Sequence, residues 1–439
     1  MGPLEIGLVI LFALLLLLST GMPIAFALGA VSVGTLFIIE GPRSLGILGE
    51  TFFGGLNSFG LVAIPMFILM GSAVASSPAG KDLYEALDRW LNRVPGGLVL
   101  SNIGACAIFS ALSGSSPATC AAIGKMGIPE MRKRGYPDTI ATGSIAAGGT
   151  LGILIPPSVT MIVYGIATET SIGRLFIAGI LPGLLLTALF MAWTIISCRM
   201  QGIGLSDVAQ KFSLKEKLEA LPRVLPFIAI IVGILWVLYG GVATPSEAAG
   251  AGALFCIVLV IVIYRIWKVG PLVQIFRGSI RESIMIMMII GAAELFAFTL
   301  SSTFVTQSIA EWISGLDVNR WVLMAIINVF LLIAGFFLPP VAVILMTAPI
   351  LLPIITQAGF DPYWFAVILT INMEIGLITP PVGLNLYVIN GIAPDIKLGT
   401  ILQGSFPYVM CMVLAIIILS IFPEIVTFLP TYMMGQAIQ

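Results

Sequence analysis

The sequence has no histidine and very few charged residues. Its 439 residues include 20 lysines and arginines and 21 aspartates and glutamates, so 9% of the side chains are charged, whereas about 25% are charged in an average soluble domain. The mean hydropathy is +1.11. So few charges cannot cover the water-exposed surface of a protein of this size. Soluble enzymes, nucleic-acid-binding proteins and secreted scaffolds are therefore excluded, and a polytopic all-α membrane protein is predicted.

The absence of histidine narrows the chemistry further. Zinc hydrolysis, haem ligation and histidine-assisted serine hydrolysis all depend on imidazole. Paired cysteines are also lacking: no CxxC motif occurs, which argues against a metal or redox site. The cysteines are interpreted as small apolar packing residues, and they are Cys106, Cys120, Cys198, Cys256 and Cys411.

Apolar stretches separated by short charged segments predict the membrane helices. A cleavable signal peptide is not expected, because MGPLEIG has no basic region, and residues 4–20 are interpreted as the first membrane helix. The predicted helices lie near residues 4–20, 22–39, 59–78, 139–170, 174–198, 224–241, 246–264, 283–303, 363–393 and 399–422.

Four of the apolar stretches are interrupted. Residues 98–130 and 321–353 contain Gly, Ser or Pro near their middle, and each is predicted to form a re-entrant helical hairpin. The segments 139–170 and 363–393 contain GILIPPS and GLITPPVG and are too long for one straight span of ~20 residues. They are predicted to be broken helices.

The distribution of lysine and arginine predicts the orientation. If the two hairpins enter from opposite sides, 17 of the 20 basic residues lie on one side, which is then cytoplasmic, and both termini are periplasmic. Those basic residues are Lys125 and the ones in 79–97, 131–138, 199–223, 265–281 and 394–398. Within the first of these segments, residues 79–93 are predicted to form an amphipathic helix at the cytoplasmic interface.

The two halves of the chain resemble each other at an offset of 224 residues. GILIPPS at 152–158 matches GLITPPV at 376–382, and Pro129 matches Pro353. Because the first half starts outside and the second inside, the halves are predicted to be inverted repeats, 1–198 and 224–439, joined by a cytoplasmic linker, 199–223. Inverted repeats with broken helices are typical of secondary transporters.

The interrupted segments supply candidate ligands for an ion. Backbone groups freed by Pro-Pro must bind another group at membrane depth, and unwound carbonyls suit hard cations. The first hairpin tip, Ser110–Thr119, carries five hydroxyl side chains, which could instead serve close helix packing. The second tip, near Pro339-Pro340, offers only backbone groups, and Thr379 adds a hydroxyl in the second break. Asn385 is either an amide donor to substrate or a packing residue.

Three glutamates lie in or near apolar segments, and each is a candidate functional residue. Glu247 follows Thr244-Pro-Ser and is interpreted as an acid at a helix N-terminus. Glu294 and Glu374 could each pair with an ion, with Asn372 or with a partner subunit, and the sequence does not decide between these alternatives. Lys125 is expected to extend its ammonium group to the interface.

Four motifs in order, SALSGSSPAT, RKRGYPD, GGTLGILIPPS and GLITPPVGLN, resemble the large membrane subunit of tripartite ATP-independent periplasmic (TRAP) transporters. The resemblance covers essentially the whole chain. It implies an elevator fold of the ion-transporter superfamily in a bacterial inner membrane. It also implies Na⁺-coupled import of a small organic acid, such as a C4-dicarboxylate or sialic acid. The expected partners are a periplasmic binding protein, a separate small four-helix membrane subunit and membrane lipid.

The resemblance also implies two Na⁺ sites with a substrate site between them. The first Na⁺ site would use the hydroxyls of Ser113 and Ser116 with the carbonyls of Gly152, Ile155 and Pro157. The second would use Gly335, Gly376, Thr379 and Val382. The substrate would lie near Ser115, Thr119 and Asn385.

Other functions remain open on the sequence. A self-sufficient Na⁺/dicarboxylate symporter would transport without partners. An intramembrane hydrolase using Ser113 or Ser116 lacks a histidine or a convincing lysine base. Paired hairpins and broken helices suit a transporter that works by alternating access better than they suit a passive channel. No phosphate-binding loop is present, so an ATP-driven pump is not expected. The lack of a histidine or a convincing lysine base argues against an enzyme.

Overall fold

The computed structural model describes residues 2–203, 212–315 and 319–435, and these residues form helices and no strand. The first half contains α1 (Pro3–Ser19), α2 (Ile24–Glu40), α3 (Leu45–Leu56), α4 (Ala63–Ala75), α5 (Ala79–Leu91), α6 (Gly97–Ser113), α7 (Ser116–Lys133), α8 (Asp138–Thr150), α9 (Val159–Ala167) and α10 (Ile172–Met200). Short 3₁₀ helices precede α3 and α4 and follow α8.

The second half contains α11 (Leu214–Tyr239), α12 (Pro245–Val262), α13 (Val269–Ser302), α14 (Val305–Gly315), α15 (Arg320–Phe337), α16 (Pro340–Gln357), α17 (Pro362–Leu377), α18 (Leu384–Ile392), α19 (Leu398–Ile421) and α20 (Glu424–Met434). Seven of the described helices are long and apolar enough to cross a membrane, or up to eight if the bent pair at 42–56 and 59–75 forms one span. The class of a polytopic helical membrane protein is confirmed.

Most predicted helices are confirmed, and the differences occur where polar residues are helical. α13 begins at Val269, whereas the predicted helix begins near residue 283, so most of the basic segment 265–281 is also helix. α11 begins at Leu214, inside the predicted linker 199–223, where Ser213 and Glu216 form a capping box. Helices α3, α14 and α20 were not predicted at all. Hydropathy identifies only the apolar part of a helix that crosses the membrane. Backbone hydrogen bonds can extend the same helix through polar residues, so hydropathy does not mark where such a helix begins.

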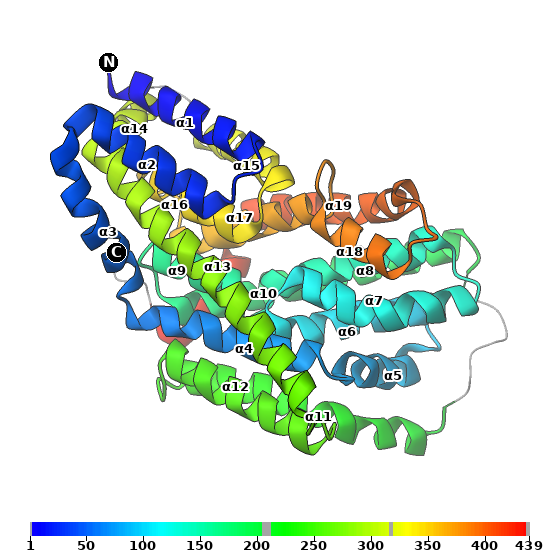
Figure 1. Cartoon of the computed structure of the whole chain (residues 1–439). Helices are drawn as coiled ribbons and strands as arrows, with labels where there is room; N and C mark the ends of the chain where they lie inside the picture. The colour runs from blue at the N-terminus through cyan, green and yellow to red at the C-terminus, as the bar shows by residue number, and fades with distance from the viewer. Residues whose placement is uncertain (1, 204–211, 316–318, 436–439) are drawn as a thin grey trace.

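Two packed regions meet along α4 and α13. Helix α13 crosses the front of the molecule in Figure 1 and contacts α2, α3, α4 and α16. Helix α12 packs on α4, and α11 packs on α5. On the other side, α8 contacts both α7 and α19. The hairpin helices α6 and α16 and the break helix α9 therefore lie against the layer that contains α4 and α13.

Both predicted breaks are present. α8 ends at Thr150, a 3₁₀ turn follows, and α9 begins at Val159. α17 ends at Leu377, and α18 begins at Leu384. Proline has no N–H to donate, so helix cannot continue through Pro156-Pro157 or Pro380-Pro381. Both Pro–Pro peptide bonds are cis.

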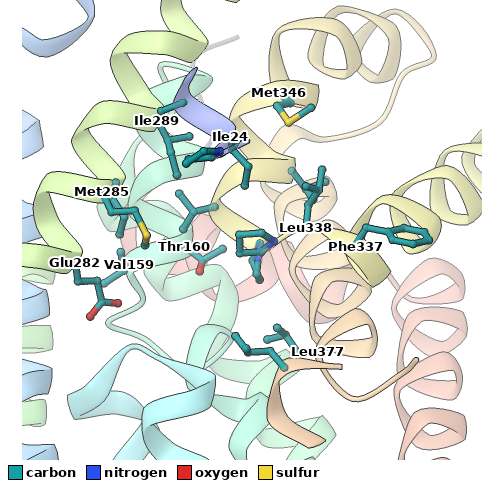
Figure 2. A pocket seen from close by; sticks show the side chains of 18 of the residues that line it. Ile24, Val159, Thr160, Glu282, Met285, Ile289, Phe337, Leu338, Met346 and Leu377 are labelled. Atoms are coloured by element: carbon teal, nitrogen blue, oxygen red, sulfur yellow. The ribbon is translucent and has the colours of Figure 1, made fainter. Parts of the chain in front are cut away.

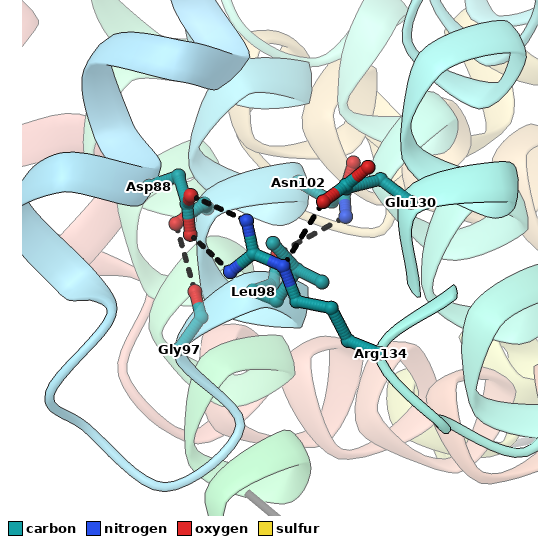
Figure 3. A network of polar contacts seen from close by, with 7 residues as sticks. Asp88, Gly97, Leu98, Asn102, Glu130 and Arg134 are labelled. Carbon is teal, nitrogen blue, oxygen red and sulfur yellow. Dashed lines mark hydrogen bonds and ion pairs between the residues drawn. The ribbon is translucent and has the colours of Figure 1, made fainter. Parts of the chain in front are cut away.

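A polar network ties the far end of the first hairpin to α5 (Figure 3). Arg134 Nη2 lies 3.0 Å from Asp88 Oδ2, and its Nε lies 3.0 Å from Glu130 Oε1. Asp88 is buried, and that burial raises the pKa of its carboxyl group, while the guanidinium of Arg134 opposes the shift. The predicted amphipathic helix, which is α5, is thus fixed to the end of α7.

Candidate functional site

Both hairpin tips open onto one cavity of about 1150 Å³. The first tip contributes the residues from Ser113 to Ala118, and the second contributes those from Phe337 to Val341. Figure 2 shows Phe337 and Leu338 of the second tip on one side of the cavity and Glu282 and Met285 of α13 on the other. Segments more than 200 residues apart in sequence therefore line the same cavity.

Four helices of the hairpins and breaks begin at the cavity wall. Ser116, Val159, Pro340 and Leu384 are the first residues of α7, α9, α16 and α18, and all four line the cavity. A helix N-terminus carries free N–H groups and a partial positive charge, which attract anions. The lining side chains include one carboxylate, Glu282, and no lysine or arginine among the described residues. Any anion here would be held by backbone dipoles and hydroxyls rather than by a basic side chain.

The first hairpin tip is tightly ordered by its own hydroxyls. Ser113 Oγ lies 2.8 Å from Thr119 Oγ1, and the Thr119 hydroxyl also donates to the carbonyl of Ser115 at 3.0 Å. Gly114 takes a left-handed conformation, with φ of 58°, which reverses the chain between α6 and α7. The two helices of the first predicted hairpin are therefore joined by a tight turn at Gly114.

The first break packs directly on this tip. A Cβ atom placed on Gly152 would lie 2.8 Å from the carbonyl oxygen of Ser115, so only glycine permits the approach. A Cβ on Gly114 would lie 3.4 Å from the carbonyl oxygen of Pro157. The structure thus brings Ser113, Ser116, Gly152 and Pro157 into one region, as expected for the first ion site, and Ile155 lies in the same break.

The second tip and the second break make the equivalent contact through backbone alone. A Cβ on Gly376 would collide with the carbonyl oxygen of Gly335. The N–H of Val382 donates to the carbonyl of Phe336 at 3.3 Å. The hydroxyl of Thr379 donates to the carbonyl of Ile375 at 2.6 Å. The residues expected at the second ion site are therefore neighbours in the fold.

The three residues expected at the substrate have different surroundings. Ser115 lines the cavity. Thr119 is fully buried and bonded within the hairpin. Asn385 is also fully buried: its Nδ2 donates to the carbonyl of Ala146 at 3.4 Å, and its Oδ1 has no hydrogen-bond partner among the described residues. Only Ser115 is brought to the cavity wall.

Glu374 occupies a position that the sequence left open. It lies in α17 and is fully buried. Its Oε2 lies 2.8 Å from Ser116 Oγ, and its Oε1 accepts from the N–H of Ile153 at 3.3 Å. A side chain from the second half thus joins the first tip to the first break. No pattern around position 374 in the sequence indicates these partners.

The other two glutamates are elsewhere. Glu247 caps α12: Thr244 N–H donates to Glu247 Oε2 at 2.8 Å, and Glu247 N–H donates to Thr244 Oγ1 at 3.3 Å, which confirms the predicted helix N-terminus. Glu294 is exposed on α13, against Gly55 of α3. Among the described residues, no group of three or more His, Cys, Asp or Glu side chains lies close enough together to hold a metal ion. A cation here would rely on hydroxyl and carbonyl oxygens.

Paired hairpins and broken helices around a membrane cavity define the class as a membrane transporter. A family model described as "Tripartite ATP-independent periplasmic transporter, DctM component" matches residues 9–425. The chain belongs to this family, the large permease proteins of TRAP transporters.

Similar proteins agree with this assignment. The chain is 38% identical over 405 residues to the C4-dicarboxylate TRAP transporter large permease protein DctM of Pseudomonas aeruginosa, covering 92% of this chain and 93% of the relative. It is 30% identical to the sialic acid TRAP transporter large permease protein SiaM of Vibrio cholerae, covering 97% and 98%. These relatives are permease subunits rather than enzymes. The crystal structure of the Alcanivorax borkumensis YdaH transporter shares the fold, with a TM-score of 0.64 over 97% of both chains at 16% identity.

Proposed function

We propose that this chain is the large membrane subunit of a Na⁺-coupled TRAP transporter that imports a small organic acid, of the C4-dicarboxylate or sialic acid type. The observation that carries the proposal is the convergence of four helix N-termini on one cavity that has no basic side chain among its described lining residues. Such a cavity suits a carboxylate, because each N-terminus offers unpaired N–H groups and a partial positive charge. The relatives' named substrates are consistent with a carboxylate.

Bound Na⁺ ions would supply the positive charge that the lining side chains of the cavity lack. A dicarboxylate would otherwise enter a site whose lining side chains include Glu282 and no cation among the described residues. Two Na⁺ ions held by the tips and breaks would offset that charge and make ion binding a condition for substrate binding. The backbone contacts of Gly152 with Ser115 and of Gly376 with Gly335 hold the carbonyls needed for hard-cation sites.

The packing also supports an elevator mechanism. α16 of the second hairpin packs on α9 of the first break, and α18 of the second break packs on α7 of the first hairpin. These crossed contacts bind the four elements into one body, which would move against the layer containing α4 and α13. Gly71 of α4 lies against the Ser113 carbonyl with no room for a side chain, so α4 packs closely on the first hairpin tip.

The test is transport by the reconstituted complex. The chain, a small TRAP membrane subunit and a periplasmic binding protein would be purified, and the membrane subunits placed in liposomes with an inward Na⁺ gradient. We expect uptake of a radiolabelled C4-dicarboxylate or sialic acid only when all three proteins and Na⁺ are present. Uptake that persists after K⁺ replaces Na⁺ would refute the coupling. Uptake by this chain alone would favour the alternative, a self-sufficient Na⁺/dicarboxylate symporter.

A further inference from the structure

The N-terminal part of α13 carries two exposed arginines, Arg277 and Arg281. None of the ion pairs among the described residues involves either of them. The neighbouring acid, Glu282, lines the cavity instead. Like charges one helical turn apart repel each other, so this pair favours an anionic ligand that would lie between the two guanidinium groups.

Both arginines lie on the outer face of α13. The residues of this part of the helix that pack inside the protein are Ile275, Ser279 and Ile286, which share one face at the spacing i, i+4 and i+11. Two residues along an α-helix correspond to a rotation of about 200°, so Arg277 and Arg281 lie nearly opposite Ile275 and Ser279. They therefore face away from the helices on which α13 packs.

The same outer face becomes apolar one turn further on. Ile284 and Met288 continue the line of the two arginines, because positions 277, 281, 284 and 288 are spaced i, i+4, i+7 and i+11. Ile284 is 58% exposed, and Ile280 beside this line is 55% exposed. The face thus has a cationic end and an apolar continuation, which together complement an anionic phospholipid lying along the helix.

The length of α13 places the arginines at the membrane surface. Its 34 residues form a helix of about 51 Å, whereas the hydrocarbon core of a bilayer is about 30 Å thick. The apolar part of the helix begins near Ile284, so Arg277 and Arg281 lie at the depth of the lipid headgroups. Trp267, just before the helix, is exposed and of a type enriched at that interface.

Two other roles explain less of this arrangement. Basic residues at one end of a membrane helix determine its orientation, but that role does not require them to share a face with each other and with an apolar line. A partner helix is also a poorer match than a lipid, because the buried part of a protein interface is depleted in charged residues.

We propose that the outer face of α13 formed by Arg277, Arg281, Ile284 and Met288 binds an anionic phospholipid. Its phosphate would lie between the two guanidinium groups, which present planar sets of N–H donors to phosphate oxygens, and an acyl chain would lie along Ile284 and Met288. The inference goes beyond the proposed function and does not rest on it, because lipid binding can be measured without transport.

Native mass spectrometry of the full chain in detergent tests the site. The chain is titrated with phosphatidylglycerol and with phosphatidylcholine of identical acyl chains. We expect phosphatidylglycerol to bind about 25-fold more tightly at the first site, since each basic residue near an anionic lipid contributes about fivefold. Arg277→Gln combined with Arg281→Gln should remove this preference, whereas Arg277→Lys combined with Arg281→Lys keeps both charges and should retain most of it.

The matched control removes two exposed basic residues elsewhere, by Arg93→Gln combined with Lys133→Gln. It changes the net charge by the same amount and should leave the preference for phosphatidylglycerol unchanged. An equal loss in this control would show that net charge attracts the lipid and would overturn the proposal. Equal binding of the two lipids by the wild type would overturn it as well.

A second measurement locates the lipid in a bilayer. Ile284→Cys is labelled with bimane in a Cys411→Ser background, since the other four native cysteines are buried. In nanodiscs, brominated phosphatidylglycerol should quench the bimane more than brominated phosphatidylcholine at equal mole fraction, and the two arginine-to-glutamine changes should abolish the difference. Equal quenching in the parent would refute the site. Loss of the difference when a small TRAP membrane subunit is added would assign this face to that protein instead.

Discussion

Gly376 lies where α17 passes the last turn of α15, and replacing it with alanine tests the second ion site. The new Cβ would collide with the carbonyl oxygen of Gly335 and lie 2.6 Å from its carbonyl carbon. These are backbone atoms, so neither can rotate away, and the two helices must separate. Over-packing of this kind costs about 1–3 kcal/mol. If the displaced carbonyl is a Na⁺ ligand, that energy is about a 5- to 150-fold loss in Na⁺ affinity.

The assay is the Na⁺ concentration for half-maximal uptake in proteoliposomes. Gly391→Ala is the matched control: it lies in α18 of the same broken helix, and its added Cβ has no heavy atom within 4 Å. Alanine there should be neutral or slightly stabilising, by up to ~1 kcal/mol. If Gly376→Ala keeps its half-saturating Na⁺ concentration within about twofold of the wild type, less than the smallest loss from over-packing, the contact with Gly335 is not part of an ion site.

Three further substitutions follow from the same geometry. Ser116→Ala should raise the half-saturating Na⁺ concentration about tenfold, because it removes a hydroxyl that bonds to both Gly149 and Glu374; unchanged Na⁺ dependence would refute the first site. Thr379→Ala should have a smaller effect on uptake, since its hydroxyl bonds within its own helix turn, and a loss as large as that of Ser116→Ala would contradict this ranking. Asp88→Asn should lower the free energy of unfolding by roughly 1–3 kcal/mol, measured by thermal denaturation, because Arg134 loses a partly buried partner.

Much of the fold could be predicted because membrane helices and proline breaks have strong local signals. The turn at Gly114, the ends of α8 and α17, and the amphipathic α5 all lie where the sequence indicates. The helices that the sequence did not predict have a shared cause: hydropathy alone does not locate α3, α14 or the start of α13. A fuller use of the repeat would have found one of them, because α14 begins at Val305 and α5 at Ala79, close to the same offset of 224 residues.

The site was less predictable than the fold. Hydroxyl-rich and glycine-rich tips can be recognised from composition, and the structure brings Ser115 and Ser116 to the cavity. Long-range partners cannot be recognised in this way: the contact of Glu374 with Ser116 spans 258 residues. Nor does the sequence show that Thr119 and Asn385 are buried in helix packing rather than open to the cavity. These facts depend on how the two halves pack, which local patterns do not determine.

The repeat itself explains why the two halves should differ in chemistry. α7 begins at Ser116 and α16 at Pro340, which is the same offset that relates Gly152 to Gly376. By that offset the counterpart of Glu374 is Thr150, whose hydroxyl bonds to the carbonyl of Ala147 in its own helix. A proline and a locally bonded threonine cannot form the chain of hydrogen bonds that Ser116 and Glu374 form. The second tip must therefore hold its break through backbone contacts, so removing a polar side-chain group should affect the first tip far more than the second.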